Sequence, residues 1–254
     1  MDQLIRRGVE SRYKGSVLGL AWSFVQPLMM LCVYTFVFSI VFRAKFGDIA
    51  NDNRMVFAVI MFTGMTVFNL FSESVLSACS LITGNTSFVK KVIFPLEILV
   101  PARVITAGIM TIPWLALAFI GNILGGPVFH ISWPMLLLPL MIVPLLLLSC
   151  GAAYFLASLA VYLKDLEHFV GVVTQILFFM SPIFYSTQTV PEQFRIILLC
   201  NPLTPIIENT RMVFLYGTMP DWITFGITLL VSAVIYQLGF FWFCKTKKGF
   251  ADVL

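Results

Sequence analysis

Long, nearly uncharged apolar runs dominate this sequence, and they restrict the chain to a fold embedded in a membrane. A helix that crosses the ~30 Å hydrocarbon core of a bilayer needs about 20 mostly apolar residues. We predict six transmembrane spans, at residues 22–42, 55–82, 104–124, 135–161, 169–185 and 222–243. Only 11% of the 254 residues are charged, whereas soluble domains carry about 25%. The chain is therefore predicted to be an all-α integral membrane protein, with residues 1–254 forming a single domain.

The distribution of Lys and Arg predicts the orientation of these spans. With the N-terminus inside, eleven of the 16 basic residues fall in inner segments and five in outer segments. Cytoplasmic loops carry an excess of Lys and Arg, so we predict a multi-pass protein with both termini in the cytoplasm. The net charge of +4 comes without a basic block, and no nucleic-acid partner is expected.

The segment before the first span has the pattern of an amphipathic helix. Within residues 1–21, Ile5 and Val9 share one helical face, and Arg6 and Arg7 lie elsewhere. Such a helix lies in the membrane interface, with its cations near anionic headgroups. We therefore predict that this segment rests on the inner membrane surface and contacts membrane lipids.

Residues 194–216, between the fifth and sixth spans, consist of two apolar pieces that are each too short to cross a bilayer. The turn Asn201-Pro202 separates them. Irregular backbone at membrane depth survives only against protein or water. We predict a re-entrant helical hairpin on the outer side; a solvent-exposed loop is the alternative.

The second span carries a polar stripe that must avoid lipid. Thr66, Asn69, Glu73, Ser77 and Ser80 recur at helical spacing and fall within an arc of about 80° at ~100° per residue. A carboxylate that faces lipid costs at least ~2.5 kcal/mol. The stripe is expected to face the bundle interior, a partner subunit or water, and the pattern favours helix packing and pore lining equally.

Aromatic residues form a second candidate lining. In the first span, Tyr34, Phe38 and Phe42 share a helical face. The rings at the end of the fifth span are Phe178, Phe179, Phe184 and Tyr185. Sugar rings stack on aromatic faces, so these residues, with Asn69 and Glu73, are candidates to line a glycan channel. Lipid contact and interfacial anchoring are the alternative for each single ring.

The sequence lacks the motifs of catalysis and nucleotide binding. It contains no G-x-x-x-x-G-K-[ST], no G-x-S-x-G and no H-E-x-x-H. The five cysteines show no C-x-x-C spacing, and the two histidines do not form a metal-ligand pattern. We therefore predict no catalytic residue, no metal site and no cofactor in this chain.

Four short motifs nevertheless follow one another in an ordered series. They are residues 12–22 (RYKGSVLGLAW) followed by Pro27, Asn85 with residues 90–95 (KKVIFP), residues 181–185 (SPIFY), and Asn201-Pro202. Together they resemble polysaccharide-export permeases, the membrane subunits of ATP-binding-cassette exporters for O-antigen, capsule and teichoic acid chains. The chain departs from that pattern at Leu96 and Lys164, where the family often carries Arg.

The resemblance implies a homodimer in the bacterial cytoplasmic (inner) membrane that surrounds a channel for a lipid-linked glycan. Two separate ATPase subunits would bind ATP and Mg, and this chain would not be an enzyme. Residues 86–94 would form the coupling helix. Its contact residues would be Asn85, Phe88, Val89, Lys90, Lys91, Val92, Ile93 and Phe94. The outer gate candidates are Asn201, Pro202, Glu208 and Arg211.

Other functions agree with the same pattern. A permease of this superfamily could carry a drug, a small lipid or teichoic acid, and a drug exporter predicts resistance phenotypes without a glycan defect. A membrane enzyme or scaffold acting alone would need a catalytic cluster near a membrane face. The only dense polar cluster is residues 164–168 (KDLEH), whose acids suit a helix N-terminus.

Overall fold

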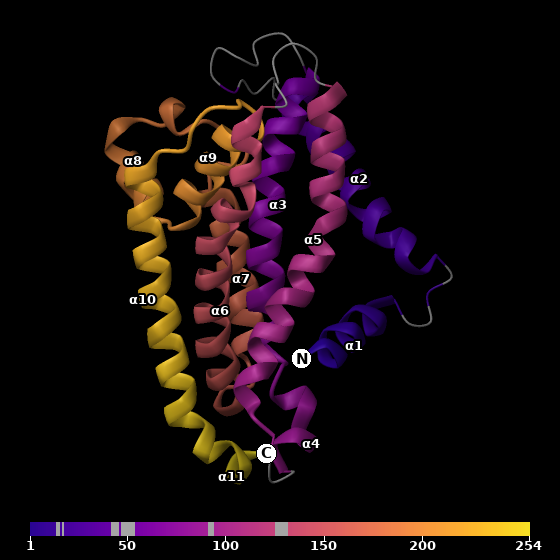
Figure 1. Cartoon of the computed structure of the whole chain (residues 1–254), viewed down its shortest axis with the longest axis vertical. Helices are drawn as coiled ribbons and strands as arrows, with labels where there is room; N and C mark the ends of the chain where they lie inside the picture. Colours follow the sequence, from indigo (N-terminus) through magenta and orange to yellow (C-terminus); the bar gives the residue numbers. More distant parts are fainter. Residues whose placement is uncertain (14–15, 17, 42–45, 47–53, 91–93, 125–131) are drawn as a thin grey trace.

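The computed structural model describes residues 1–13, 16, 18–41, 46, 54–90, 94–124 and 132–254, and this part of the chain is helical (Figure 1). The long helices are α3 (Arg54–Cys79), α5 (Leu99–Leu124), α6 (Leu138–Tyr162) and α10 (Trp222–Thr246). Four helical stretches in the described residues are long and apolar enough to cross a membrane. They are Met55–Cys79, Leu96–Leu124, Trp133–Tyr162 and Trp222–Gly249.

Shorter helices complete the bundle. The apolar ones are α2 (Trp22–Tyr34), which continues as a π-helical segment (Thr35–Val41), and α7 (Leu166–Met180). The others are α1 (Asp2–Tyr13), α4 (Thr86–Lys90), α8 (Glu192–Cys200), α9 (Leu203–Phe214) and α11 (Phe250–Val253). Single 3-10 turns occupy Gly19–Ala21, Thr83–Asn85, Leu96–Ile98, Trp133–Leu137, Thr187–Thr189 and Lys247–Gly249.

Helix α3 is the centre of the bundle. It contacts α5, α6, α7 and α9, and 78% of its most apolar window is buried, compared with 33% or less for the other three long stretches. Its buried side chains include Phe57, Ile60, Met61 and Phe62. A helix enclosed in this way can carry polar side chains without exposing them to lipid, which is what the polar stripe requires.

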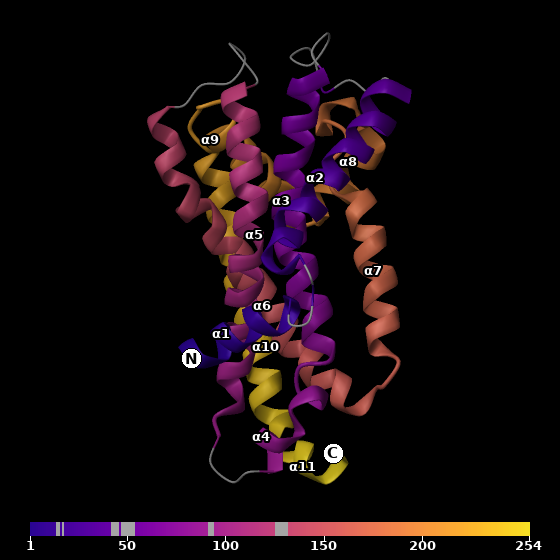
Figure 2. The ribbon, with the colours of Figure 1, turned by 90° about the vertical axis from the view of Figure 1, so that its right-hand side faces the viewer.

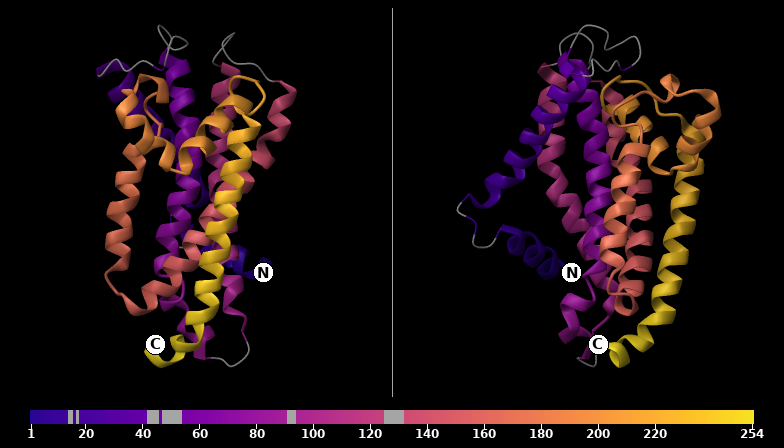
Figure 3. Two further views of the ribbon diagram at one scale, coloured as in Figure 1. Left: turned by 90° about the vertical axis from the view of Figure 1, so that its left-hand side faces the viewer. Right: turned by 180° about the vertical axis from the view of Figure 1, so that it is seen from behind.

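The two ends of the bundle are formed by different helices. Figure 2 shows α7 standing to one side of α3, opposite α5. In both views of Figure 3, α8 and α9 lie in the upper half of the bundle, while the C-terminus lies at the lower end. Helix α1 lies against α5 and leaves the bundle at a steep angle to the long helices (Figure 1). The N-terminus is in the same half as the C-terminus (Figures 1 and 3).

The all-helical membrane fold predicted from the sequence is confirmed, and the helix bounds differ in detail. The predicted spans 22–42 and 169–185 correspond to the two shorter apolar helices. Helix α7 ends at Met180 because Pro182 follows, and Ser181 before it takes an extended conformation (φ −92°, ψ 147°). Helix α5 already begins at Leu99.

Helices α6 and α10 approach each other closely where two glycines meet. A Cβ on Gly151 in α6 would lie 2.6 Å from the backbone nitrogen of Tyr236 in α10. A Cβ on Gly239 would collide with the carbonyl oxygen of Gly151. Small residues at helix crossings of membrane proteins allow the backbones to touch. The α6–α10 contact therefore depends on these two positions.

Gly239→Ala is expected to separate α6 from α10, because the new methyl group meets backbone rather than a movable side chain. Overpacking of this kind costs about 1–3 kcal/mol, and thermal unfolding of the purified protein in detergent should show a lower midpoint. The control is Gly226→Ala in the same helix, where a Cβ meets nothing within 4 Å. Equal midpoints for both variants would contradict the account.

Candidate functional site

A cavity of about 320 Å³ lies among α2, α3, α5 and α7. Its lining combines neutral polar and aromatic side chains, among them Gln26, Asn69, Trp114, Gln175 and Phe178. None of its described lining residues is charged. We call it the interior cavity for its place between helices that are far apart in the sequence, although it is open on one side, where Gln26, Met30 and Gln175 are exposed. It suits a neutral ligand with many hydroxyl groups.

An aromatic cluster borders the interior cavity. The ring centroid of Tyr34 in α2 lies 5.5 Å from that of Phe184 and 6.1 Å from that of Phe178. Phe38 stacks on Phe184 at 4.2 Å. Tyr34, Phe178 and Phe179 line the cavity, whereas Phe184 is buried. The structure thus brings the two predicted aromatic stripes together.

Phe42 falls outside the described residues. Tyr185, another predicted channel-lining residue, does not line the interior cavity. Tyr185 is half-buried, and its hydroxyl donates to the carbonyl oxygen of Phe179 over 3.1 Å. Tyr185 therefore braces the non-helical turn that follows α7.

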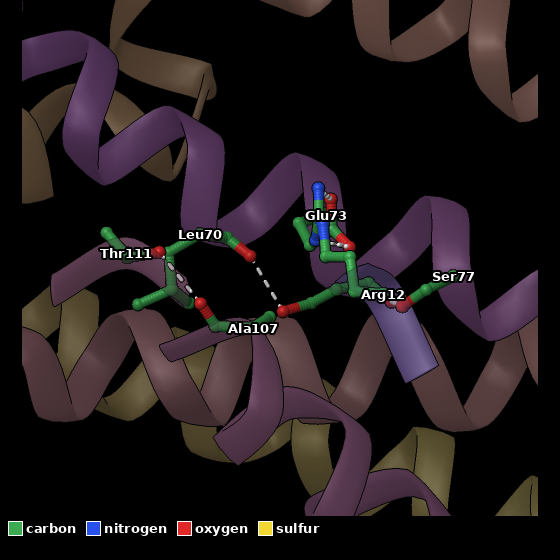
Figure 4. A network of polar contacts seen from close by, with 7 residues as sticks. Arg12, Leu70, Glu73, Ser77, Ala107 and Thr111 are labelled. Atoms are coloured by element: carbon green, nitrogen blue, oxygen red, sulfur yellow. Dashed lines mark hydrogen bonds and ion pairs between the residues drawn. The ribbon is translucent and has the colours of Figure 1, made fainter. Parts of the chain in front are cut away.

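Glu73, on the polar stripe of α3, pairs with an arginine from the N-terminal helix. The guanidinium of Arg12 donates to both carboxylate oxygens, over 2.5 Å and 3.2 Å (Figure 4). Both side chains are about one-third exposed. Two other stripe residues bond locally: the hydroxyl of Thr66 donates to the carbonyl oxygen of Phe62, and that of Ser77 to the carbonyl oxygen of Ser74. A two-pronged pair of this kind is strong and directional, so it fixes α1 to the central helix.

Three smaller cavities continue from the interior cavity toward α1, with volumes of about 80, 160 and 240 Å³. Neighbouring cavities share lining residues. The interior cavity and the cavity of about 80 Å³ share Gln26, Asn69 and Trp114. The cavity of about 160 Å³ shares Arg12, Glu73 and Ala107 with the one of about 80 Å³, and Gly8, Arg103 and Thr106 with the one of about 240 Å³. The sequence did not predict the roles of Arg12 and Arg103 in this series, because neither residue lies in a predicted span.

At the opposite end of the bundle, two of the sequence motifs bind each other. The side-chain amide of Asn201 donates to the hydroxyl of Ser181 over 3.0 Å, and its oxygen accepts from the backbone N–H of Leu203. Pro202 begins the turn into α9. Glu208 accepts from the hydroxyl of Thr187 over 2.7 Å. Asn201 therefore ties the end of α7 to the start of α9.

Arg211 is almost fully buried in the same region, at 3% exposure. Its guanidinium donates to the carbonyl oxygens of Ile60, Pro182 and Ile183 over 3.2, 2.6 and 3.0 Å. Gly64 leaves room for it, since a Cβ there would lie 2.6 Å from a terminal nitrogen of Arg211. The structure places this outer gate candidate inside the protein, where it fastens α9 to α3 and to the turn after α7.

The cytoplasmic connection predicted from the sequence contains α4. Phe88 stacks on Phe94 with ring centroids 4.7 Å apart, and both pack with Val89 against a core cluster that includes Phe250. The side-chain amide of Asn85 donates to the carbonyl oxygen of Leu81. Three predicted coupling residues, Lys91, Val92 and Ile93, lie outside the described residues, as does the side chain of Lys90.

Comparison with known proteins places these features in a family. Residues 2–215 match the model of the family described as ABC-2 type transporter. The chain is 25% identical to the O-antigen export system permease protein RfbA of Klebsiella pneumoniae, over 99% of its length and 93% of that protein. It is 27% identical to the RfbA protein of Myxococcus xanthus, over 98% and 93%. The Polysialic acid transport protein KpsM of Escherichia coli is 23% identical, over 90% and 84%.

Arg211→Met is expected to destabilise the protein by about 2–5 kcal/mol, because three buried carbonyl oxygens lose their donor. The thermal unfolding midpoint in detergent measures this loss. Arg195→Met is the matched control, since Arg195 also bonds two backbone carbonyls but is partly exposed, so water replaces it. A midpoint that falls equally in the two variants would show that burial of Arg211 does not matter.

Proposed function

Because the chain belongs to the ABC-2 type transporter family, we propose that it is the permease subunit of an ATP-driven exporter for lipid-linked polysaccharide. The observation that carries this proposal is the similarity, over nearly the whole chain, to proteins named as O-antigen export permeases. The exporter moves an O-antigen-like chain across the bacterial inner membrane. The chain itself is a transport component rather than an enzyme.

The interior cavity supports a glycan as the cargo. Its lining is uncharged and mixes amide groups with the rings of Tyr34, Trp114 and Phe178. Amides exchange hydrogen bonds with sugar hydroxyls, and aromatic faces accept the C–H edges of sugar rings. This combination of amide groups and aromatic rings can bind an uncharged sugar chain without an ion pair that would hold it in place.

A second copy of the chain completes the channel in this proposal. Helices α2 and α7 border the interior cavity and also expose large apolar side chains. Among these are Phe24, Met29, Val33, Phe169, Val172 and Ile176. A homodimer would cover part of this surface and place a wall opposite each cavity.

The transmembrane topology follows from the same proposal. Helices α2 and α7 join the four long helices as spans, which gives six, and both termini lie in the cytoplasm. The α8–α9 pair then forms the outer re-entrant hairpin, with Asn201, Pro202, Glu208 and Arg211 shaping the outer gate. The support is the position of α8 and α9 in the half of the bundle opposite the C-terminus (Figure 3) and the basic residues near that terminus.

The energy for transport comes from two separate ATPase subunits that bind ATP and Mg. The sequence of this chain has no phosphate-binding loop. Helix α4 and the residues that follow it are the proposed coupling helix. The ring of Phe88 in α4 stacks on that of Phe94, and an amphipathic helix of this kind can dock in a groove of a partner protein.

Deletion of the gene tests the proposed function. The expected result is loss of the surface polysaccharide and accumulation of the lipid-linked glycan inside the cell, because synthesis continues without export. A plasmid copy should restore both. Immunoblotting of surface glycan and extraction of lipid-linked intermediates measure the two effects. Unchanged surface polysaccharide, together with altered drug sensitivity, would contradict the proposal.

Phe88→Asp tests the coupling contact. A carboxylate in place of the ring removes the stack with Phe94, and we expect the ATPase to be lost from pull-downs while the permease still inserts in the membrane. The control is Ser80→Asp, which adds the same charge at an exposed position outside α4. Retention of the ATPase and of export by Phe88→Asp would refute the role of α4.

A further inference from the structure

Three arginines surround the two cavities that lie farthest from the aromatic cluster. Arg7 and Arg103 line the cavity of about 240 Å³, and Arg12 and Arg103 line the adjoining one of about 160 Å³. Both cavities also contain Gly8 and Thr106. We call this pair of spaces the arginine cavity; it lies between α1 and α5, where the N-terminal helix meets the bundle.

The arginine cavity has an excess of positive charge. Among its described lining residues, Glu73 is the one carboxylate, and Arg12 holds it. In the part of the chain that the structure describes, neither Arg7 nor Arg103 forms an ion pair or a side-chain hydrogen bond. Two guanidinium groups, those of Arg7 and Arg103, therefore face this space while its one described carboxylate, Glu73, is paired with Arg12.

The close packing of α1 on α5 keeps the three arginine side chains near one another. A Cβ on Gly8 would lie 3.1 Å from the side chain of Thr106, so a larger residue at this position would push α1 away. Figure 4 shows Arg12 reaching Glu73 on α3 from this helix. The backbone of α1 thus carries Arg7 and Arg12 to either side of the contact, and Arg103 comes from α5 beneath it.

We propose that the arginine cavity binds the phosphate or diphosphate group of a membrane lipid. Arginine is the residue that matches phosphate oxygens with two parallel hydrogen bonds. Glu73 engages Arg12 in the same two-pronged way, so a phosphate competes with this carboxylate for it. The apolar lining residues Leu4 and Leu99 are positioned for the first carbons of the lipid chain.

Cavities that share lining residues lie in series between this site and the interior cavity. A lipid that carries the exported glycan would keep its phosphate at the arginine cavity while its first sugars enter the interior cavity. This assignment of the lipid rests on the proposed function. An ordinary anionic phospholipid offers the same phosphate chemistry. The probes below distinguish these two sources.

The test measures binding of three lipids to the purified full-length protein in detergent: undecaprenyl diphosphate, phosphatidylglycerol and, as a neutral-headgroup control, phosphatidylcholine. Wild-type protein is expected to prefer undecaprenyl diphosphate. Arg103→Gln should weaken that binding about tenfold, the loss of one charge-assisted hydrogen-bonding partner. Arg6→Gln is the matched control, because Arg6 pairs with Glu10 on the exposed side of the same helix and does not line the cavity.

Glu73→Gln separates binding from folding. Removing the competing carboxylate frees Arg12, so undecaprenyl diphosphate should bind several-fold more tightly, whereas a purely structural pair predicts a lower unfolding midpoint and no tighter binding. Equal lipid affinity of Arg103→Gln and Arg6→Gln would overturn the inference. Equal, arginine-dependent binding of phosphatidylglycerol would support the phosphate site and assign it to bulk lipid. A gene deletion that leaves surface polysaccharide intact overturns the proposed function instead.

Discussion

Polar groups that enter the hydrocarbon core must find their partners inside the protein, and this constraint shapes both ends of the bundle. Glu73 on the central helix would cost at least ~2.5 kcal/mol if it faced lipid. Arg12 meets it from α1, and the pair ties α1, which packs on α5, to the central helix. The position of α1, and with it the lining of the cavities between α1 and α5, depends on this ion pair and on the contact of Gly8 with Thr106.

At the other end of the bundle, the end of α7 leaves backbone carbonyl oxygens that need hydrogen-bond donors. Helix α7 stops before Pro182, and the carbonyl oxygens of Pro182 and Ile183 have no partner within the helix. Arg211 supplies donors to both and to Ile60 of α3. Between these two charged contacts lies the interior cavity, whose described lining is neutral. The charged side chains Arg12, Glu73 and Arg211 thus hold the helices together, whereas amide groups and aromatic rings line the cavity between them.

Much of this architecture is readable from the sequence. The apolar runs predict the long helices because span length is set by bilayer thickness, and the Asn201-Pro202 turn separates two short helices as expected. Contacts between distant segments are not readable in the same way. The periodicity of α3 shows that Glu73 needs a polar partner but does not identify Arg12 as that partner. Likewise, nothing in the sequence near Arg211 shows that its side chain binds the backbone of α3 and of the turn after α7.

The central claim is that this chain moves a lipid-linked polysaccharide when its ATPase partner hydrolyses ATP. Reconstitution of the purified permease and ATPase into liposomes, with lipid-linked glycan in the outer leaflet, tests it most directly. On complexes whose ATPase faces outward, added ATP should move glycan into the lumen, where an external glycosidase no longer cleaves it. Full cleavage with and without ATP, from complexes that hydrolyse ATP, would contradict the account.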